Sequence, residues 1–114
     1  MNGHDKHTYY LSNLERYIEQ IGLERRNIDF ILREPTRFYP HDNHMMTMCD
    51  MIIGVYGYQA IALELKGCKA KRHKAKQQIA SGKEFIMKEL NREYLHGLFV
   101  VYFHPKTYYV EIIG

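Results

Sequence analysis

Ala62-Leu63-Glu64-Leu65-Lys66-Gly67 is an apolar segment that carries a carboxylate and an ammonium group two positions apart. Because side chains alternate between the two faces of a β-strand, Glu64 and Lys66 are expected on one face and the leucines on the other. Two charges that project together from so apolar a segment are unusual as mere solubilising groups. The segment therefore predicts a central strand with chemistry at its C-terminal end.

A second apolar segment, residues 49–55, precedes this strand, and glycines between the two segments signal a turn. A tight turn makes residues 58–66 the antiparallel partner of the earlier segment. Counting back from the turn places Asp50 roughly opposite Glu64, so the two carboxylates are expected to be neighbours across the ladder. Two acids and a lysine that converge at one edge of a sheet can hold Mg²⁺ and activate a water molecule.

The rest of the chain predicts one helix before these strands, then a helix and a hairpin after them. Apolar positions recur at helical spacing in residues 8–22 and 69–91. Alternating or apolar segments predict further strands at residues 27–34, 98–103 and 108–113. The order α-β-β-β-α-β-β indicates a mixed α/β (α+β) fold, with a central mixed sheet flanked by helices.

Length and composition are those of one globular domain. The chain has 114 residues, of which 46% are hydrophobic and 25% are charged. We expect a flexible tail at residues 1–7 and a single domain at 8–114. No apolar run approaches the roughly 20 residues of a membrane helix, and the N-terminus lacks the apolar core of a signal peptide. With two cysteines and no disulfide framework, a reduced, cytoplasmic location is expected.

A basic segment follows the central strand directly. The net charge is only +3, but residues 66–76 contain six basic side chains and no acid, namely Lys66, Lys69, Lys71, Arg72, Lys74 and Lys76. A local basic patch attracts polyphosphate even on a nearly neutral chain. Taken alone, such a run is usually a solvated helix face. Beside the suspected site, we expect Lys69, Lys71, Arg72 and Lys74 to bind nucleic acid.

Asp50, thirteen intervening residues and Glu64-Leu65-Lys66 together resemble the PD-(D/E)XK pattern of the restriction-endonuclease-like nuclease superfamily. The resemblance extends over nearly the whole chain after about Thr8, with a helix before the strands and a basic helix after them. Cys49 departs from it, because many members have proline before the first acid. The small size and the element order are also similar to those of archaeal Holliday-junction resolvases.

The resemblance implies a restriction-endonuclease-like core and a Mg²⁺ cofactor, with Mn²⁺ as a substitute. Asp50, Glu64 and the backbone carbonyl of Leu65 would be its ligands. Lys66 would orient or deprotonate the attacking water and stabilise developing negative charge. Two further residues are candidates for the catalytic set: Glu15 on the first helix and Gln78, which shares a face of the second helix with Lys74.

The expected function is hydrolysis of DNA phosphodiester bonds by a homodimeric endonuclease or exonuclease, and the similarity to junction resolvases implies specificity for branched structures. The alternative is an inactive nuclease-fold module that binds nucleic acid or a protein partner. Each residue also has a simpler interpretation: Glu64 and Lys66 as an exposed pair, Asp50 as a strand start and Glu15 as a solvated helix residue. His41 and His44 lack a third zinc ligand and are expected in a loop.

Overall fold

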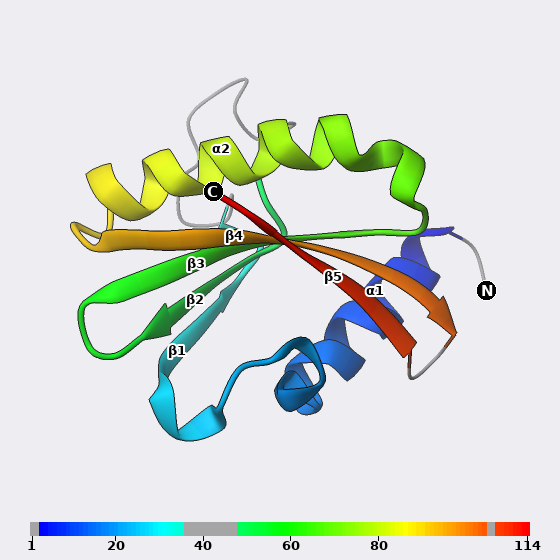
Figure 1. The fold of residues 1–114 in the computed structure, drawn as a ribbon, viewed down its shortest axis with the longest axis horizontal. Coiled ribbons are helices and arrows are strands. Elements are labelled where there is room, and N and C mark those ends of the chain that lie inside the picture. The colour runs from blue at the N-terminus through cyan, green and yellow to red at the C-terminus, as the bar shows by residue number, and fades with distance from the viewer. Residues whose placement is uncertain (1–2, 36–47, 105–106) are drawn as a thin grey trace.

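The structure is a computed structural model that describes residues 3–35, 48–104 and 107–114. It is a mixed α+β fold of five strands and two α-helices (Figure 1). The elements are α1 (Gly3–Arg16), β1 (Ile28–Arg33), β2 (Met51–Val55), β3 (Gln59–Lys66), α2 (Arg72–Lys88), β4 (Glu93–His104) and β5 (Thr107–Ile113). Short 3₁₀ turns stand at Ile18–Ile21, Arg25–Asn27 and Lys69–Lys71. The predicted element order is confirmed.

The five strands form one mixed sheet in the order β1-β2-β3-β4-β5. Each strand is antiparallel to its neighbour except β4, which runs parallel to β3. A parallel connection requires a crossover, and α2 provides it. The carboxyl end of β3 and the first turn of α2 therefore lie at the same end of the sheet.

The two helices cover opposite faces of the sheet (Figure 1). Leu11, Leu14 and Ile18 pack with alternate residues of the strands, among them Leu63 and Leu65. On the other face the apolar side of α2 packs against the intervening strand residues, which include Ile52, Ala62 and Phe99. The apolar alternation of β3 thus separates two cores, and the Glu64 position belongs to the face under α2.

The turn between β2 and β3 fixes the register on which the site depends. Tyr56 and Gly57 have φ angles of 58° and 78°, which suits the right-handed twist of a tight hairpin. Val55 pairs with Gln59 and Met51 pairs with Leu63, as counting back from the turn predicts. The Asp50 amide continues the ladder by donating to the Leu63 carbonyl at 3.0 Å.

Several boundaries differ from the sequence prediction. Helix α1 already begins at Gly3, so most of the expected tail at residues 1–7 belongs to the helix, which ends at Arg16 before a 3₁₀ turn. Strand β4 begins at Glu93, five residues before the expected start, because its first half pairs with β3 despite its polar sequence. In the described part of the chain, no helix has the length and apolarity needed to cross a membrane. Most of the expected loop, with His41 and His44, lies outside the described residues.

Candidate functional site

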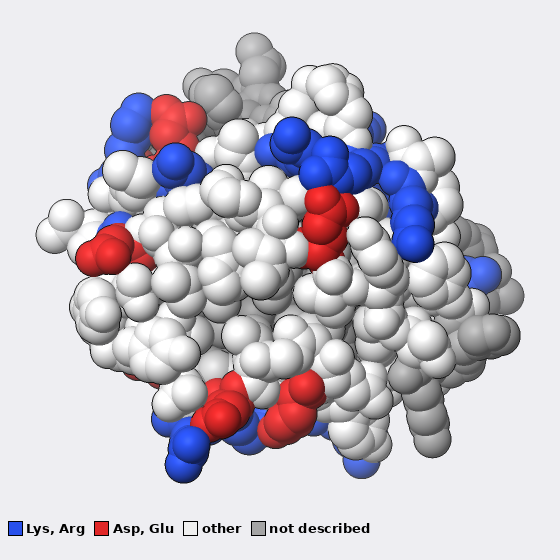
Figure 2. Space-filling model, in the orientation of Figure 1, with Lys and Arg blue, Asp and Glu red and all other residues white. Residues whose placement is uncertain are grey.

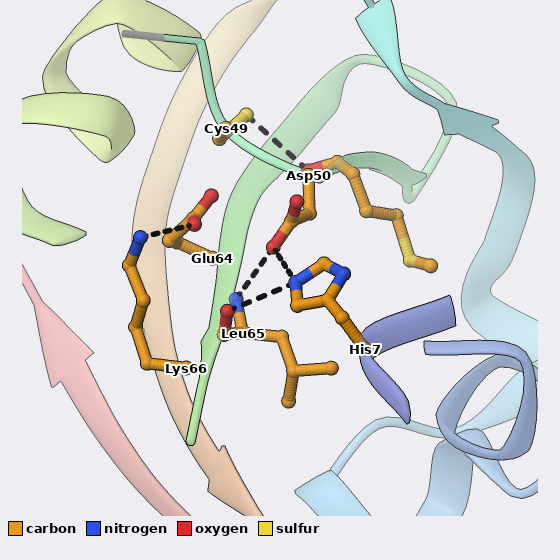
Figure 3. A network of polar contacts seen from close by, with 7 residues as sticks. His7, Cys49, Asp50, Glu64, Leu65 and Lys66 are labelled. Atoms are coloured by element: carbon orange, nitrogen blue, oxygen red, sulfur yellow. Dashed lines mark hydrogen bonds and ion pairs between the residues drawn. The ribbon is translucent and has the colours of Figure 1, made fainter. Parts of the chain in front are cut away.

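Asp50 and Glu64 lie at one end of the sheet, where β2 begins and β3 nears its end (Figure 3). The ladder brings their backbones close together, since Met51 pairs with Leu63 and the Asp50 amide donates a hydrogen bond to the Leu63 carbonyl. Their charges interact, because the Asp50 carboxylate contributes to the raised pKa of Glu64. The predicted juxtaposition of two acids across the hairpin is therefore present.

Glu64 is an almost completely buried acid. Its residue is 2% exposed, and its Oε2 lies 3.1 Å from Lys66 Nζ. The pKa of its carboxyl is raised from 4.5 to about 8, chiefly by burial and further by the Asp50 charge, whereas Lys66 opposes the rise. The other oxygen, Oε1, is buried and has no hydrogen-bond partner among the described residues. A buried carboxyl oxygen without a partner is costly, and either a proton on Glu64 or a bound cation would relieve that cost.

Lys66 projects from the same face as Glu64, as the alternation predicts. Its side chain is 14% exposed, so the ammonium group lies mostly out of solvent but at an accessible edge. One of its three N–H donors is directed at Glu64 in this arrangement (Figure 3). Among the described residues Glu64 is its ion-pair partner, and the other two donors can serve a group that enters the site.

Asp50 holds the end of β3 through its side chain. Its Oδ2 accepts a hydrogen bond from the Leu65 amide at 2.9 Å, and the same oxygen lies 3.2 Å from His7 Nε2. His7 Nε2 is also 3.2 Å from the Leu65 carbonyl oxygen. Two of the oxygens expected to bind a cation therefore converge on one imidazole nitrogen (Figure 3).

His7 is the site residue that the sequence prediction missed. It was expected in a tail, but α1 extends to Gly3 and carries His7 over the ends of β2 and β3. The hydrogen bond to Asp50 raises the pKa of His7 above its usual 6.5, although burial opposes this. Its position four residues before Leu11, a buried residue of the helix face that packs on the sheet, was the available signal.

Gln78 lies in the layer between α2 and the sheet. Gly82, one helical turn later, packs against Ala62, and Ala62 is two residues before Glu64 on the same strand face. Since α2 runs back along β3, one turn earlier on the helix corresponds to the Glu64 end of the strand. Gln78 is 9% exposed and its Oε1 has no hydrogen-bond partner in the described structure. Gln78 therefore lies in the same layer as Glu64, and its catalytic role stays a prediction.

Glu15 is not brought to the His7 contact. It lies eight residues after His7, about 12 Å further along α1. Its carboxylate forms an ion pair with Arg33 at the end of β1. The diagonal course of α1 thus brings His7 to β3 and Glu15 to β1. The ion pair with Arg33 gives Glu15 a structural role between α1 and β1.

The expected nucleic-acid contacts lie on the surface next to the site. Lys69, Lys71, Arg72 and Lys74 are all exposed. Arg72 is held by Glu111 of β5, with an Nη2–Oε2 distance of 2.5 Å. Lysine and arginine side chains gather over the first half of α2, with an acidic side chain against them (Figure 2). Cys68, between Lys66 and this surface, is an exposed free thiol, whereas Cys49 is a buried one.

Within residues 3–35, 48–104 and 107–114, no three His, Cys, Asp or Glu side chains are grouped as a ready metal-binding cluster. A cation site here would consist of two carboxylates, a backbone carbonyl and the His7 ring. Comparisons with protein families, with curated proteins and with solved structures give no match for this chain.

Proposed function

We propose that this chain is a divalent-metal-dependent nuclease that hydrolyses DNA phosphodiester bonds at the end of β3. The observation that carries the proposal is the Asp50, Glu64 and Lys66 constellation, with one buried carboxylate oxygen lacking any described partner. The order of elements and the single parallel pair in the sheet support an assignment to the restriction-endonuclease-like fold.

The donor set fits a hard divalent cation. Asp50 and Glu64 supply carboxylate oxygens and Leu65 supplies a carbonyl oxygen, which are the ligand types that Mg²⁺ and Mn²⁺ prefer. Burial and the Asp50 charge raise the pKa of Glu64 to about 8, and a bound cation would offset both effects by favouring the ionised carboxylate. When bound, such a cation neutralises phosphate charge and makes water a stronger nucleophile.

The protein groups have distinct roles in the proposed reaction. Water adds to phosphorus, one phosphorus–oxygen ester bond breaks, and the departing oxygen takes up a proton. Lys66 donates hydrogen bonds to the attacking water or to a phosphate oxygen and stabilises the charge that grows in the transition state. Gln78 orients water in the same layer. The basic residues that follow β3 hold the polyphosphate near this end of the sheet.

The test is cleavage of labelled duplex, branched and single-stranded DNA with Mg²⁺, Mn²⁺ or excess chelator. We expect cleavage only with metal, and a loss of at least a hundredfold for Glu64→Gln and for Lys66→Met. Glu93→Gln is the matched control, since Glu93 is an exposed acid at the opposite end of the same sheet. Cleavage that persists in Asp50→Ala combined with Glu64→Ala would exclude the assignment.

A second candidate is a nuclease-like module that binds nucleic acid without hydrolysing it. It is favoured by the absence of a three-residue ligand cluster among the described side chains and by the contact of His7 with Asp50. Calorimetric titration with Mn²⁺ separates the two functions. Saturable binding that is lost in Asp50→Asn supports the nuclease, whereas no metal binding together with salt-dependent DNA affinity supports the module.

A further inference from the structure

An aromatic pair stands beside the candidate site on the face that carries Glu64 and Lys66. Across the sheet, Lys66 pairs with Val101, and Val101 pairs with Tyr109. Directly paired residues share a face, and neighbouring strands are about 4.8 Å apart, so Tyr109 is about 10 Å from Lys66 along the sheet. Phe103 follows two residues after Val101 on β4, at an irregularity of the β4–β5 register, and its ring lies near the same Lys69 ammonium group as the Tyr109 ring.

Lys69 joins these two rings to the basic surface. Its Nζ lies 4.0 Å from the ring centroid of Tyr109 and 5.9 Å from that of Phe103. We call Lys69, Phe103 and Tyr109 the aromatic shelf. Lys69 covers one ring closely, whereas Phe103 is 53% exposed, so a large apolar ring remains open to solvent. An open ring beside an ammonium group is a suitable surface for a nucleobase whose phosphate is held by the cation.

The charges around the shelf favour a nucleic acid as its occupant. Lys71 and Lys74 are exposed on the adjoining turn and helix, and no described carboxylate forms an ion pair with either. The nearby acid, Glu111, is held by Arg72. The surface therefore offers positive charge for phosphates and a ring for a base next to the strand end that carries Lys66.

We propose that the aromatic shelf stacks an unpaired base next to the cleaved bond, so that the protein selects nucleic acid with a single-stranded segment at this position. A base inside a duplex is already stacked on its neighbours and cannot lie on Phe103. The inference specifies the substrate of the proposed nuclease and rests on that function for its biological meaning. Its binding test does not depend on cleavage.

The experiment measures binding of fluorescent single-stranded and duplex oligonucleotides of equal length by anisotropy in excess chelator. We expect Phe103→Ala to weaken single-strand binding about tenfold and duplex binding less than twofold. Tyr56→Ala is the control, because Tyr56 is equally open at 55% exposure but lies at the opposite end of β3. An unchanged single-strand affinity, or equal losses for both oligonucleotides, overturns the proposal.

A second variant tests the proposal even if Phe103→Ala does not fold. The chain contains no tryptophan, so Phe103→Trp introduces a single indole on the shelf. The fluorescence of this indole should be quenched when single-stranded oligonucleotide is added. The oligonucleotide concentration at half-maximal quenching should equal the one at half-maximal anisotropy change. The fluorescence of Tyr56→Trp should not change. Absence of quenching while the strand is bound excludes stacking. Quenching without any metal-dependent cleavage retains the shelf and rejects the nuclease.

Discussion

His7 connects the first helix to the candidate site through a single ring nitrogen. Nε2 lies 3.2 Å from both the Asp50 carboxylate and the Leu65 carbonyl. Imidazole is a better ligand for Mn²⁺ than for Mg²⁺, which prefers oxygen. We therefore expect His7→Ala to weaken Mn²⁺ binding roughly tenfold and Mg²⁺ binding much less, as measured by calorimetry.

The matched control for this prediction is His73→Ala, because His73 is exposed on α2 and hydrogen-bonds only to Gln77 in the described structure. A uniform change in the affinities for both metals would mean that His7 only stabilises the helix. Tighter binding in His7→Ala would mean that the ring competes with the cation.

His96 gives a pH dependence that is independent of the site. It lines a cavity of about 410 Å³ with Leu23 and Ile112, and burial lowers its pKa below 6.5. The His96 ring therefore binds a proton more readily in the unfolded chain than in the folded one. For this reason its contribution to stability is present above pH 6.5 and is lost as the pH falls below that value. Urea unfolding from pH 7.5 to 5 should show a steeper loss in the native chain than in His96→Gln. Parallel curves would contradict the assigned burial.

At the residue scale, the placement of the two acids and the lysine at one end of the sheet was predictable, because strand alternation and hairpin register follow from short-range patterns. Asp50, Glu64 and Lys66 needed only the turn and a count along two strands. Glu15 and His7 depended on the direction in which α1 crosses the sheet. Packing between elements that are distant in sequence sets that direction. The spacing of apolar residues along one helix does not contain this information.

Helix α2 is fixed to the sheet by a close approach at Gly82. A Cβ at this position would lie 2.6 Å from Cys49 Sγ and 2.8 Å from Ala62 Cβ. Helix propensity alone predicts that Gly82→Ala stabilises the protein by about 1 kcal/mol. The clash reverses the sign, and we expect a net loss of about 1–2 kcal/mol in the free energy of unfolding.

Chemical denaturation tests this prediction, with Ala80→Gly as the control. Ala80 is exposed on the same helix, so its replacement should cost about 1 kcal/mol from propensity alone. A stabilised Gly82→Ala protein would show that α2 does not approach β3 as described. Gly82 is therefore a packing contact within a continuous helix.

At the scale of elements, the types and the order of the helices and strands were predictable from the sequence, whereas the first residues of α1 and β4 were not. The meander β1–β3 has clear alternation and a turn signal, and it was predicted to within two residues. The first half of β4 includes Glu93 and His96, and its pairing with β3 comes from the crossover rather than from its own apolar pattern. The start of α1 is rich in His, Asp and Lys, so an apolar pattern cannot show that the helix begins there.

For the whole molecule, the candidate site is present once per chain, at one end of a body of 36 × 35 × 23 Å. Cutting both strands of a duplex symmetrically needs two such sites related by a two-fold axis. We therefore expect a homodimer of twice 13.6 kDa by multi-angle light scattering. The measurement is made at micromolar concentration with and without duplex DNA. A monomer under both conditions would restrict the proposed nuclease to single-strand cuts.

The two cysteines differ in a way that makes the folded molecule easy to observe. Cys49 is 3% exposed and burial raises its pKa, so its thiol is unreactive in the native state. Cys68 is exposed two residues beyond Lys66. A maleimide fluorophore should thus attach once per native chain, at the rim of the candidate site, and a second time only when the fold opens. The emission of the fluorophore on Cys68 would then report whether a ligand occupies the candidate site. The number of fluorophores attached per chain would report unfolding.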